Sequence, residues 1–229
     1  ESRETWRQAD FHKVLREFES MLAFGYDEQR PPDNLEEHID LICNGYARDQ
    51  DAAVNCSIIP IVHGPSELLP QLCAAVATKT GVSILAVPER LLGGGIFARV
   101  SALIQIRKEL NETGKYVGLH LLGTGNPLSV AIYSIYGADS FDGLEWCQTV
   151  VDHDSGFLFH LSQADFFKMQ TEWGNSRLPS HLWVLAHNVE FYENWMLRLR
   201  ASINEERGVE FCRRNFPRAI YMKCAEAMG

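Results

Sequence analysis

The sequence predicts an α/β fold built around a parallel β-sheet. Short apolar segments alternate with helical patterns between about residues 20 and 151, and such alternation is typical of β/α units. The apolar segments are continuous runs, as expected for strands that are buried on both faces. Polar residues or glycines lie in the loop or turn after each run, so functional side chains are expected at the carboxyl ends of the strands.

Five strands are predicted, and turn or loop residues follow them. They cover residues 21–26, 57–62, 82–87 and 116–122, and a segment within 138–146. Four helices are predicted to connect them: one that begins after Asp33 or Asn34, and three over residues 66–81, 96–110 and 127–136. Pro127 suits the first position of a helix, and Gly81 suits a helix end.

The two ends of the chain differ from this region. Residues 1–20 carry apolar side chains at helical spacing, which predicts a helix that covers a sheet: Trp6, Phe11, Val14, Leu15 and Phe18. Residues 152–182 lack a clear period, whereas residues 188–203 form a strong helical pattern. Because no linker is visible, we predict one domain over residues 1–229, with a covering helix (1–20), β/α units (21–151) and an irregular and helical region (152–229).

Charge limits the kinds of partner that the chain can bind. Its 229 residues contain 21 Lys and Arg against 30 Asp and Glu, a net charge of -9. Proteins that grip a long stretch of phosphate backbone usually have a basic surplus, so any contact with nucleic acid must be local or shared with a basic partner. The surplus carboxylates, such as Asp40, Asp49 and Glu205, are dispersed and are predicted to form a solvated surface. No apolar run reaches the ~18 residues that a membrane span requires.

The six cysteines predict reduced, buried thiols. None forms a C-x2-C pair, and several lie in apolar helical patterns, as Cys73 does in LLPQLCAAVA. This usage is typical of a cytoplasmic protein and differs from that of a disulfide framework or a zinc cluster. We therefore expect no metal site.

Candidate site residues gather at the predicted strand ends. In chain order they are Asp27, His63, the loop with Glu89, Arg90, Gly93 and Gly94, the turn that begins at Gly123, and Asp142. Carboxylates accept hydrogen bonds from ring N–H groups, and glycine lets the backbone approach a ligand edge, so a planar, nitrogen-rich ligand would suit this set.

Each of these residues also has a simpler interpretation. Asp27 is equally compatible with a turn, and His63 with a hydrogen-bonded loop histidine. The glycines match neither the G-x-G-x-x-G dinucleotide pattern nor a phosphate loop with its lysine. Asp142 lies in an otherwise apolar strand, where a buried carboxylate is rare unless it is paired or functional.

The order of these motifs resembles the tRNA-guanine transglycosylase family. AFGYDEQRPP, at Asp27, resembles the family strand whose aspartate reads the guanine edge, and IPIVHGP places His63 where a base-reading glutamine would stand. AVPERLLGGG loosely matches the glycine-rich base loop, and HLLGTGNP resembles the family's L-G-V-G-x-P turn. GADSFDGLEW resembles the G-x-D-x-F-D segment, whose second aspartate, here Asp142, is the covalent nucleophile. AHNVEFYENWMLRLR resembles the C-terminal L-H-N-L-x-x-Y helix.

The resemblance covers roughly residues 20–205. It implies a (β/α)8 TIM-barrel-like fold, of which about five β/α units are visible. It also implies an enzyme that replaces a guanine in tRNA or DNA with a 7-deazaguanine, without a cofactor. Asp142 would be catalytic, and seven residues would bind substrate: Asp27, His63, Glu89, Arg90, Gly93, Gly94 and Gly123. The VPER loop and the missing zinc motif resemble the branch of the superfamily that acts on DNA.

The sequence also departs from the family pattern. His187 matches the histidine of the family's zinc site, but residues 152–186 lack the family's C-x-C-x-x-C cluster. The histidines of that stretch, His153, His160 and His181, match no standard zinc spacing. The family's first strands and their acid/base aspartate have no counterpart, so we expect a further N-terminal segment, a second chain or a homo-oligomer to complete the barrel. Two alternatives stay open: a non-catalytic subunit that binds nucleic acid or base beside an active partner, and a nucleosidase in which water replaces the incoming base.

Overall fold

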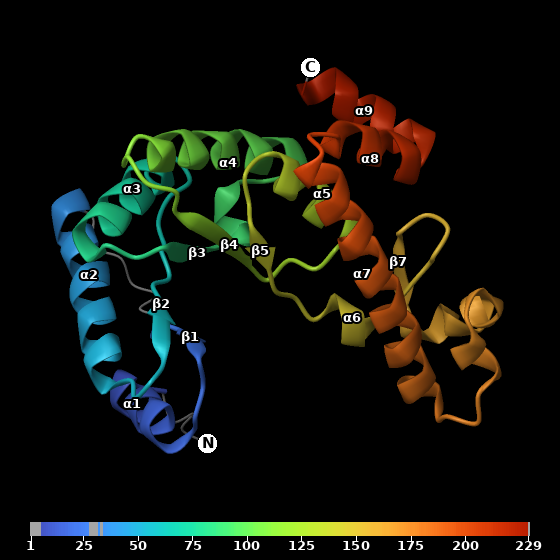
Figure 1. Ribbon diagram of the computed structural model, residues 1–229, viewed down its shortest axis with the longest axis horizontal. Coiled ribbons are helices and arrows are strands. Elements are labelled where there is room, and N and C mark those ends of the chain that lie inside the picture. The colour runs from blue at the N-terminus through green and yellow to red at the C-terminus, as the bar shows by residue number, and fades with distance from the viewer. Residues whose placement is uncertain (1–5, 28–31, 33, 229) are drawn as a thin grey trace. The chain divides into compact units, whose positions relative to one another are not determined.

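The computed structural model describes residues 6–27, 32 and 34–228, and it has the predicted α/β class (Figure 1). The chain divides into two compact units, which we describe separately. The first unit comprises residues up to 94 together with 101–121, and the second comprises residues 95–100 together with 122–229. The expected single domain stays a prediction. Within the described ranges, no helix is both long enough and apolar enough to cross a membrane.

The strands of the first unit follow one another in chain order. They are β1 (Leu22–Phe24), β2 (Ser57–Ile59), β3 (Ile84–Pro88) and β4 (Gly118–Leu122). β1 runs parallel to β2, and a parallel bridge between Ile61 and Ala86 leads from the end of β2 to β3. β3 lies next to β4, where the Gly118 N–H donates to the Ser83 carbonyl at 2.8 Å. The first four predicted strands are therefore confirmed, although each is shorter than its apolar run.

Helices separate these strands as predicted. They are α1 (Gln8–Glu17), α2 (Leu35–Ala52), α3 (Leu69–Thr80) and α4 (Ile96–Asn111), and a 3-10 turn, η1 (Glu89–Leu92), follows β3. The Asn34 side chain caps α2 by accepting from the N–H groups of Glu36 and Glu37 at 2.9 and 3.1 Å. Gly81 ends α3 in the left-handed conformation, with φ of 73°. α2 packs against both α3 and β2 (Figure 1).

Two helix faces differ from their predicted patterns. In α4, Val100, Leu103 and Ile106 are buried, whereas Ile104, which the spacing of Ile96, Val100 and Leu103 predicts on the same face, is 41% exposed. A residue one position from Leu103 is rotated by about 100° around the helix axis, which explains its exposure. In the covering helix α1, Leu15 is buried and contributes to the cluster against which Phe11 packs. The other three apolar side chains expected there are largely exposed: Trp6, Val14 and Phe18.

The second unit is mainly helical. Its elements are α5 (Pro127–Ile135), β5 (Ser140–Phe141), α6 (Glu145–Gln148), β6 (Thr149–Val151), β7 (Leu158–His160), η2 (Leu161–Gln170), η3 (Glu172–Asn175), α7 (Ser180–Asn204), α8 (Gly208–Asn215) and α9 (Arg218–Met228). The fifth predicted strand is only two residues long, because the chain turns at Gly143 into α6. The antiparallel hairpin of β6 and β7 and the helices α8 and α9 were not predicted.

Aromatic side chains form much of the core of the second unit. Phe191 stacks on Trp195 with ring centroids 5.3 Å apart, and Trp195 meets the edge of Phe211 from α8 at 5.0 Å. A second cluster joins Val150 of β6 to Trp183 of α7. These contacts bury one face of α7 along much of its length.

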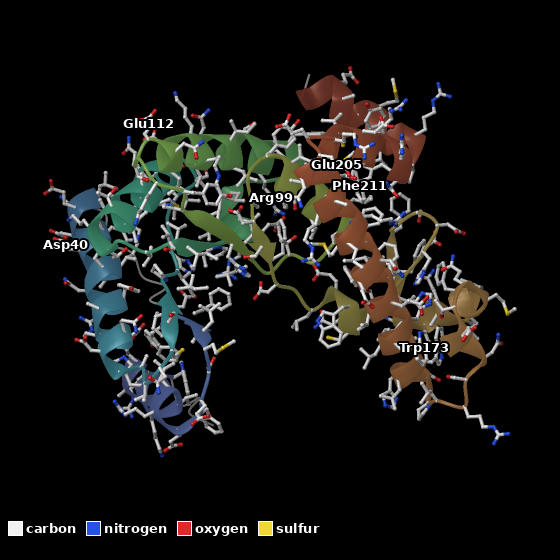
Figure 2. All side chains as sticks on the ribbon, viewed as in Figure 1. Asp40, Arg99, Glu112, Trp173, Glu205 and Phe211 are labelled. Atoms are coloured by element: carbon white, nitrogen blue, oxygen red, sulfur yellow. The ribbon has the colours of Figure 1, made fainter. Side chains whose placement is uncertain are left out.

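Most of the carboxylates predicted to be exposed and most of the thiols predicted to be buried are so in the structure. Asp40 points away from α2 into solvent (Figure 2), where it pairs with Lys79 at 2.8 Å. Glu205 is also exposed. Four of the six cysteines are buried, as predicted: Cys56, Cys73, Cys212 and Cys224. Cys43 and Cys147 are only half-buried. Burial raises the pKa of the Cys73 thiol well above its ordinary value, so this thiol stays protonated.

Candidate functional site

The first unit brings Asp27 and His63 into contact. Asp27 follows β1, and His63 follows the bridge that extends β2. Because β1 and β2 are parallel neighbours, their carboxyl ends lie at the same edge of the sheet. Asp27 Oδ1 lies beside His63 Nε2 as an ion pair when the imidazole is protonated. The His63 side chain is 10% exposed and the Asp27 side chain 32%, so the pair is partly open to a ligand.

A second histidine lies close to His63. His38 of α2 is 4% exposed, and burial, followed by the proximity of His63, lowers the pKa of its imidazole. His38 is therefore neutral at neutral pH. Gly64, with φ of 157°, lies between the two histidines and α3, and a Cβ atom there would come within 2.7 Å of Leu72 Cδ1. The chain needs glycine at this position to place His63.

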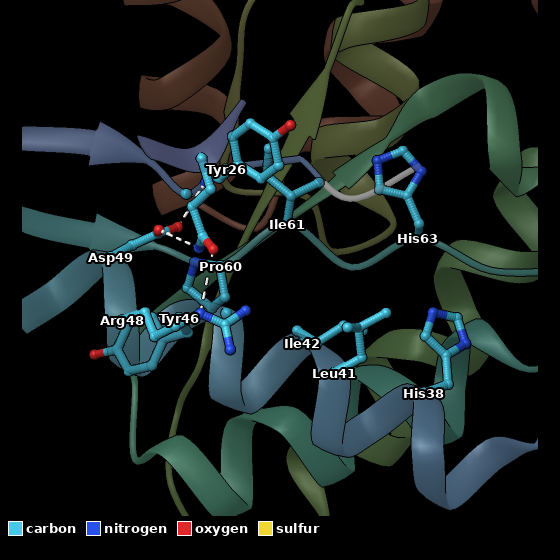
Figure 3. Close-up of a pocket in the computed structure, with 13 residues that line it drawn as sticks. Tyr26, His38, Leu41, Ile42, Tyr46, Arg48, Asp49, Pro60, Ile61 and His63 are labelled. Atoms are coloured by element: carbon cyan, nitrogen blue, oxygen red, sulfur yellow. Dashed lines mark hydrogen bonds between the residues drawn. The ribbon is translucent and has the colours of Figure 1, made fainter. Parts of the chain in front are cut away.

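The buried carboxylate of Asp49 lines a small pocket of about 50 Å³ next to this site (Figure 3). Its Oδ1 accepts from Gln8 Nε2 at 2.7 Å and contacts His12 Nε2 at 2.7 Å, and its Oδ2 accepts from the Tyr26 N–H at 2.7 Å. The expectation that Asp49 is a solvated surface residue was wrong, because it is only 1% exposed. Asp49 fixes the backbone immediately before Asp27.

The spacing of residues along α2 contained a signal for Asp49. Leu35, Ile39, Ile42, Tyr46 and Asp49 recur every three or four residues, and this spacing places them on one face of a helix. A carboxylate at the end of an apolar stripe is expected to be buried and paired. The sequence analysis used the stripe only as far as residue 43.

The four site residues predicted after β3 lie in the first unit. Glu89 and Arg90 belong to η1, and Leu92, with 1% exposure, anchors this turn in the core. Gly93 follows with φ of 138°, a conformation that favours glycine, and Gly94 is exposed. Because β3 is the parallel neighbour of β2, this loop begins at the sheet edge where His63 lies.

In the second unit, the loop that begins at Gly123 holds Asp142. The Gly123 N–H donates to Asp142 Oδ1 at 2.6 Å, and the Thr124 N–H donates to the Asp142 carbonyl at 2.6 Å. The two loops approach closely, since a Cβ atom on Gly143 would lie 2.6 Å from the Gly125 nitrogen. Gly123 has φ of 79°, which explains the need for glycine there.

Asp142 is exposed, so the expectation of a carboxylate buried within an apolar strand was wrong. β5 ends at Phe141, and Asp142 lies just beyond it. The carboxylate lines a cavity of about 720 Å³, whose wall also includes Trp146, Tyr192, Trp195 and Arg200. Cavities of ~300–1,000 Å³ are typical of small-molecule sites.

Three residues of the AHNVEFY segment on α7 support this part of the second unit. Tyr192 Oη donates to the Gly125 carbonyl at 2.8 Å, and burial raises the pKa of its hydroxyl, which keeps it protonated as a donor. Asn188 Oδ1 accepts from the Val151 N–H at 3.0 Å, and its Nδ2 donates to the carbonyls of Trp146 and Thr149. These contacts hold α6 and β6 on α7.

His187, the third of these residues, makes contacts that support the fold. It is fully buried, with Nε2 2.8 Å from the Val151 carbonyl and Nδ1 3.1 Å from Thr171 Oγ1. Burial lowers the pKa of the imidazole. His153 Nε2 lies 3.0 Å from the His187 carbonyl. Among the described residues, no three His, Cys, Asp or Glu side chains are grouped so that they could hold a metal ion.

The sequence-predicted site residues thus form two groups, each in its own unit. The first unit contains Asp27, His63, Glu89, Arg90, Gly93 and Gly94, and the second contains Gly123 and Asp142. The structure brings Asp27 to His63 and Gly123 to Asp142. The expectation that both groups serve one ligand stays a prediction. Comparison with models of known protein families gave no match, and a search among curated proteins gave no significant match either.

Proposed function

We propose that this protein is a base-exchange glycosyltransferase that replaces a guanine in a nucleic acid with a 7-deazaguanine. One observation carries the proposal: Asp142 is an exposed carboxylate that lines a ligand-sized cavity while a backbone N–H holds one of its oxygens at 2.6 Å. The hydrogen bond from the Gly123 N–H orients this exposed carboxylate. That state suits a nucleophile.

The proposed reaction proceeds by two displacements at the sugar. An Asp142 oxygen attacks the anomeric carbon of the target nucleotide, the bond to the guanine N9 breaks, and guanine leaves with the bonding electrons and gains a proton. The ring nitrogen of a 7-deazaguanine then loses its proton and attacks the same carbon. The ester bond to Asp142 breaks, which restores the carboxylate.

Recognition of the base is assigned to the first unit. Asp27 would accept hydrogen bonds from the N–H groups of the guanine edge, and His63 would orient Asp27 or contact the base. Glu89, Arg90, Gly93 and Gly94 would form a loop over the base. A target base in a duplex has to be extruded from its stack to reach such residues. In this proposal the parallel strands belong to a TIM-barrel-like fold that a further segment or chain completes.

An exchange assay tests the proposal. The protein is incubated with guanine-containing tRNA or DNA and labelled 7-deazaguanine, and both guanine release and label incorporation are measured. Asp142→Asn should abolish both, because an amide of the same shape is a far poorer nucleophile. Glu193→Gln is the matched control, since Glu193 is an exposed carboxylate that lines the same cavity, and it should retain exchange.

The two alternatives give different results in this assay. A nucleosidase releases guanine without added 7-deazaguanine and incorporates no label. A non-catalytic subunit binds nucleic acid but releases no guanine. Exchange at the wild-type level in Asp142→Asn would remove Asp142 from the mechanism.

A further inference from the structure

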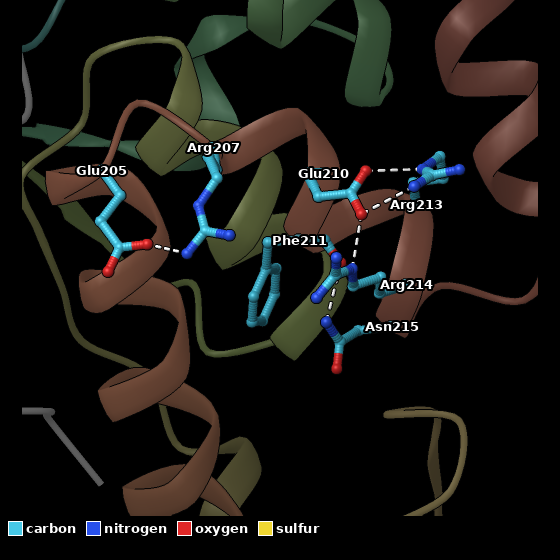
Figure 4. Close-up of polar contacts among 7 residues, drawn as sticks. All are labelled: Glu205, Arg207, Glu210, Phe211, Arg213, Arg214 and Asn215. Atoms are coloured by element: carbon cyan, nitrogen blue, oxygen red, sulfur yellow. Dashed lines mark hydrogen bonds and ion pairs between the residues drawn. The ribbon is translucent and has the colours of Figure 1, made fainter.

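Three arginines of the second unit surround a hollow of about 430 Å³ between α7 and α8. Arg198 comes from α7. Arg207 precedes α8, and Arg214 lies in α8 (Figure 4). Arg198 Nη1 donates to Asn215 Oδ1 at 3.0 Å and so connects the two helices. We call this feature the arginine hollow; its lining also includes Glu210 and Phe211.

The arginines remain accessible although they have acidic neighbours. Glu210 accepts from Arg213 at 2.6 and 2.7 Å and from Arg214 at 2.5 Å, and Arg207 pairs with Glu205. The Arg207 side chain is 56% exposed, that of Arg213 60% and that of Arg214 67%. Exposed ion pairs contribute little stability, so an anionic ligand can compete for these guanidinium groups.

The charge of this region is opposite to that of the whole chain. Residues 196–218 contain six arginines, three glutamates and no lysine, which gives a local charge of +3 in a chain of net charge -9. Glu210 keeps its negative charge, because its hydrogen bonds from Arg213 and then Arg214 lower the pKa of the carboxyl to about 2. The positive balance therefore already includes the ionised Glu210.

Arginine is the cation best suited to phosphate recognition. Its planar guanidinium donates two parallel hydrogen bonds to phosphate oxygens and is more weakly hydrated than an ammonium group. A chain with an acidic surplus needs such a local basic surface to hold a polyanion. Three guanidinium groups that surround one open hollow can contact more than one phosphate of a strand.

We propose that the arginine hollow binds the phosphodiester backbone of the nucleic-acid substrate. This inference rests on the proposed function, because it names the surface that holds the polymer whose base is exchanged. The contacts would go to phosphates, so they would position the strand without reading its sequence.

The first test is the binding of a guanine-containing oligonucleotide as a function of salt. The triple variant Arg198→Gln, Arg207→Gln, Arg214→Gln should bind about tenfold more weakly than the wild type. Because it makes fewer phosphate contacts, the magnitude of its negative slope of log K against log salt should be smaller by about 2–3. The control triple Arg16→Gln, Lys108→Gln, Arg177→Gln changes three exposed cations outside the arginine hollow. Its net charge equals that of the first triple variant. It should bind like the wild type. An equal loss in both triples would overturn the proposal.

A second variant should shift the affinity in the opposite direction. Glu210→Gln removes the carboxylate that Arg213 and Arg214 share, so oligonucleotide binding should become several-fold tighter. Glu112→Gln is the matched control, because Glu112 is an exposed acid at the end of α4 (Figure 2), and it should leave affinity unchanged. Unchanged or weaker binding by Glu210→Gln would contradict the proposal, even if the triple variant does not fold.

Two competitors identify the ligand class. Inorganic phosphate, at concentrations too low to alter ionic strength, should not displace the oligonucleotide; displacement would indicate a small-anion site. Polyglutamate should bind more weakly than the oligonucleotide, and equal binding would indicate an acidic protein partner. Either result would overturn the proposal. Because Asp142→Asn should bind the oligonucleotide normally, failure of exchange is distinguishable from failure of binding.

Discussion

At the scale of single residues, the site depends on carboxylates whose environments differ. Asp27 is half-buried beside His63, Asp49 is buried among three partners, and Asp142 is exposed with a backbone N–H on one oxygen. The partners set the roles that these carboxylates can take. A carboxylate held by several donors supports structure, whereas an exposed one can reach a substrate.

Replacement of Asp27 tests its assignment to base recognition. Asp27→Ala should weaken the binding of guanine and of 7-deazaguanine by about tenfold or more, because a hydrogen bond to a charged group contributes ~1.5–3 kcal/mol. Oligonucleotide affinity should change less. Isothermal titration calorimetry measures both, with Asp51→Ala as an exposed control on α2. Unchanged affinity for both bases would indicate that Asp27 is only a turn residue.

Replacement of Asp49 should affect stability first. Asp49→Ala leaves the Gln8 amide, the His12 ring and the Tyr26 N–H without their shared acceptor. The free energy of unfolding should fall by about 3 kcal/mol, because buried groups that lose a hydrogen-bond partner cost ~1–3 kcal/mol each. Asp51→Ala should change it by less than about 0.5 kcal/mol. Chemical denaturation measures both, and equal effects would show that the Asp49 contacts do not stabilise the fold.

At the scale of elements, α7 organises much of the second unit. Its residues His187, Asn188 and Tyr192 hold β6, α6 and the loop at Gly125. The sequence predicted a helix here over residues 188–203, and α7 extends from Ser180 to Asn204. These three side chains therefore connect α7 to three segments that precede it in the chain.

The environment of His187 predicts acid sensitivity. Burial lowers the pKa of its imidazole below the unfolded value, so the unfolded chain binds a proton at a higher pH than the folded chain does. Its contribution to stability is complete above about pH 6.5 and decreases as pH falls below that value. His38 acts in the same direction. Thermal melting should therefore show a lower Tm at about pH 5.5 than at about pH 7.5.

A variant separates the contribution of His187 from that of other groups. His187→Gln has no titrating group at this position, so its Tm should fall less between these two pH values than that of the wild type. The variant should also melt lower at all pH values, because it loses buried hydrogen bonds. An identical pH dependence in both proteins would contradict the assignment.

The sequence predicted repeating elements well and irregular ones poorly. Continuous apolar runs and caps such as Asn34 and Gly81 identified four strands and their helices, because periodicity and capping act locally. The hairpin of β6 and β7 has three-residue strands, which lie outside the longer apolar runs that marked β1 and β2. The proximity of Asp27 and His63 followed from strand order, whereas the partners of Asp49 lie on α1 and just after β1 and have no local signal.

At the scale of the whole molecule, the proposed reaction assigns different tasks to different parts of the chain. In this proposal, base recognition would belong to the loops after β1, β2 and β3, the nucleophile to the loop after β5, and backbone binding to the arginine hollow. The consecutive order of β1 to β4 supports the proposed TIM-barrel-like fold, in which neighbouring strands follow one another along the chain. The net charge of -9 confines nucleic-acid contact to local basic surfaces.

The most direct test of the central claim is the location of a covalent adduct. The protein is mixed with a labelled guanine-containing oligonucleotide or tRNA without 7-deazaguanine, denatured and digested, and the adduct is mapped by mass spectrometry. We predict an adduct on the peptide that contains Asp142, absent from Asp142→Asn, present in Glu193→Gln, and lost when 7-deazaguanine is added before denaturation. An adduct on another residue, or one that persists in Asp142→Asn, would contradict the account.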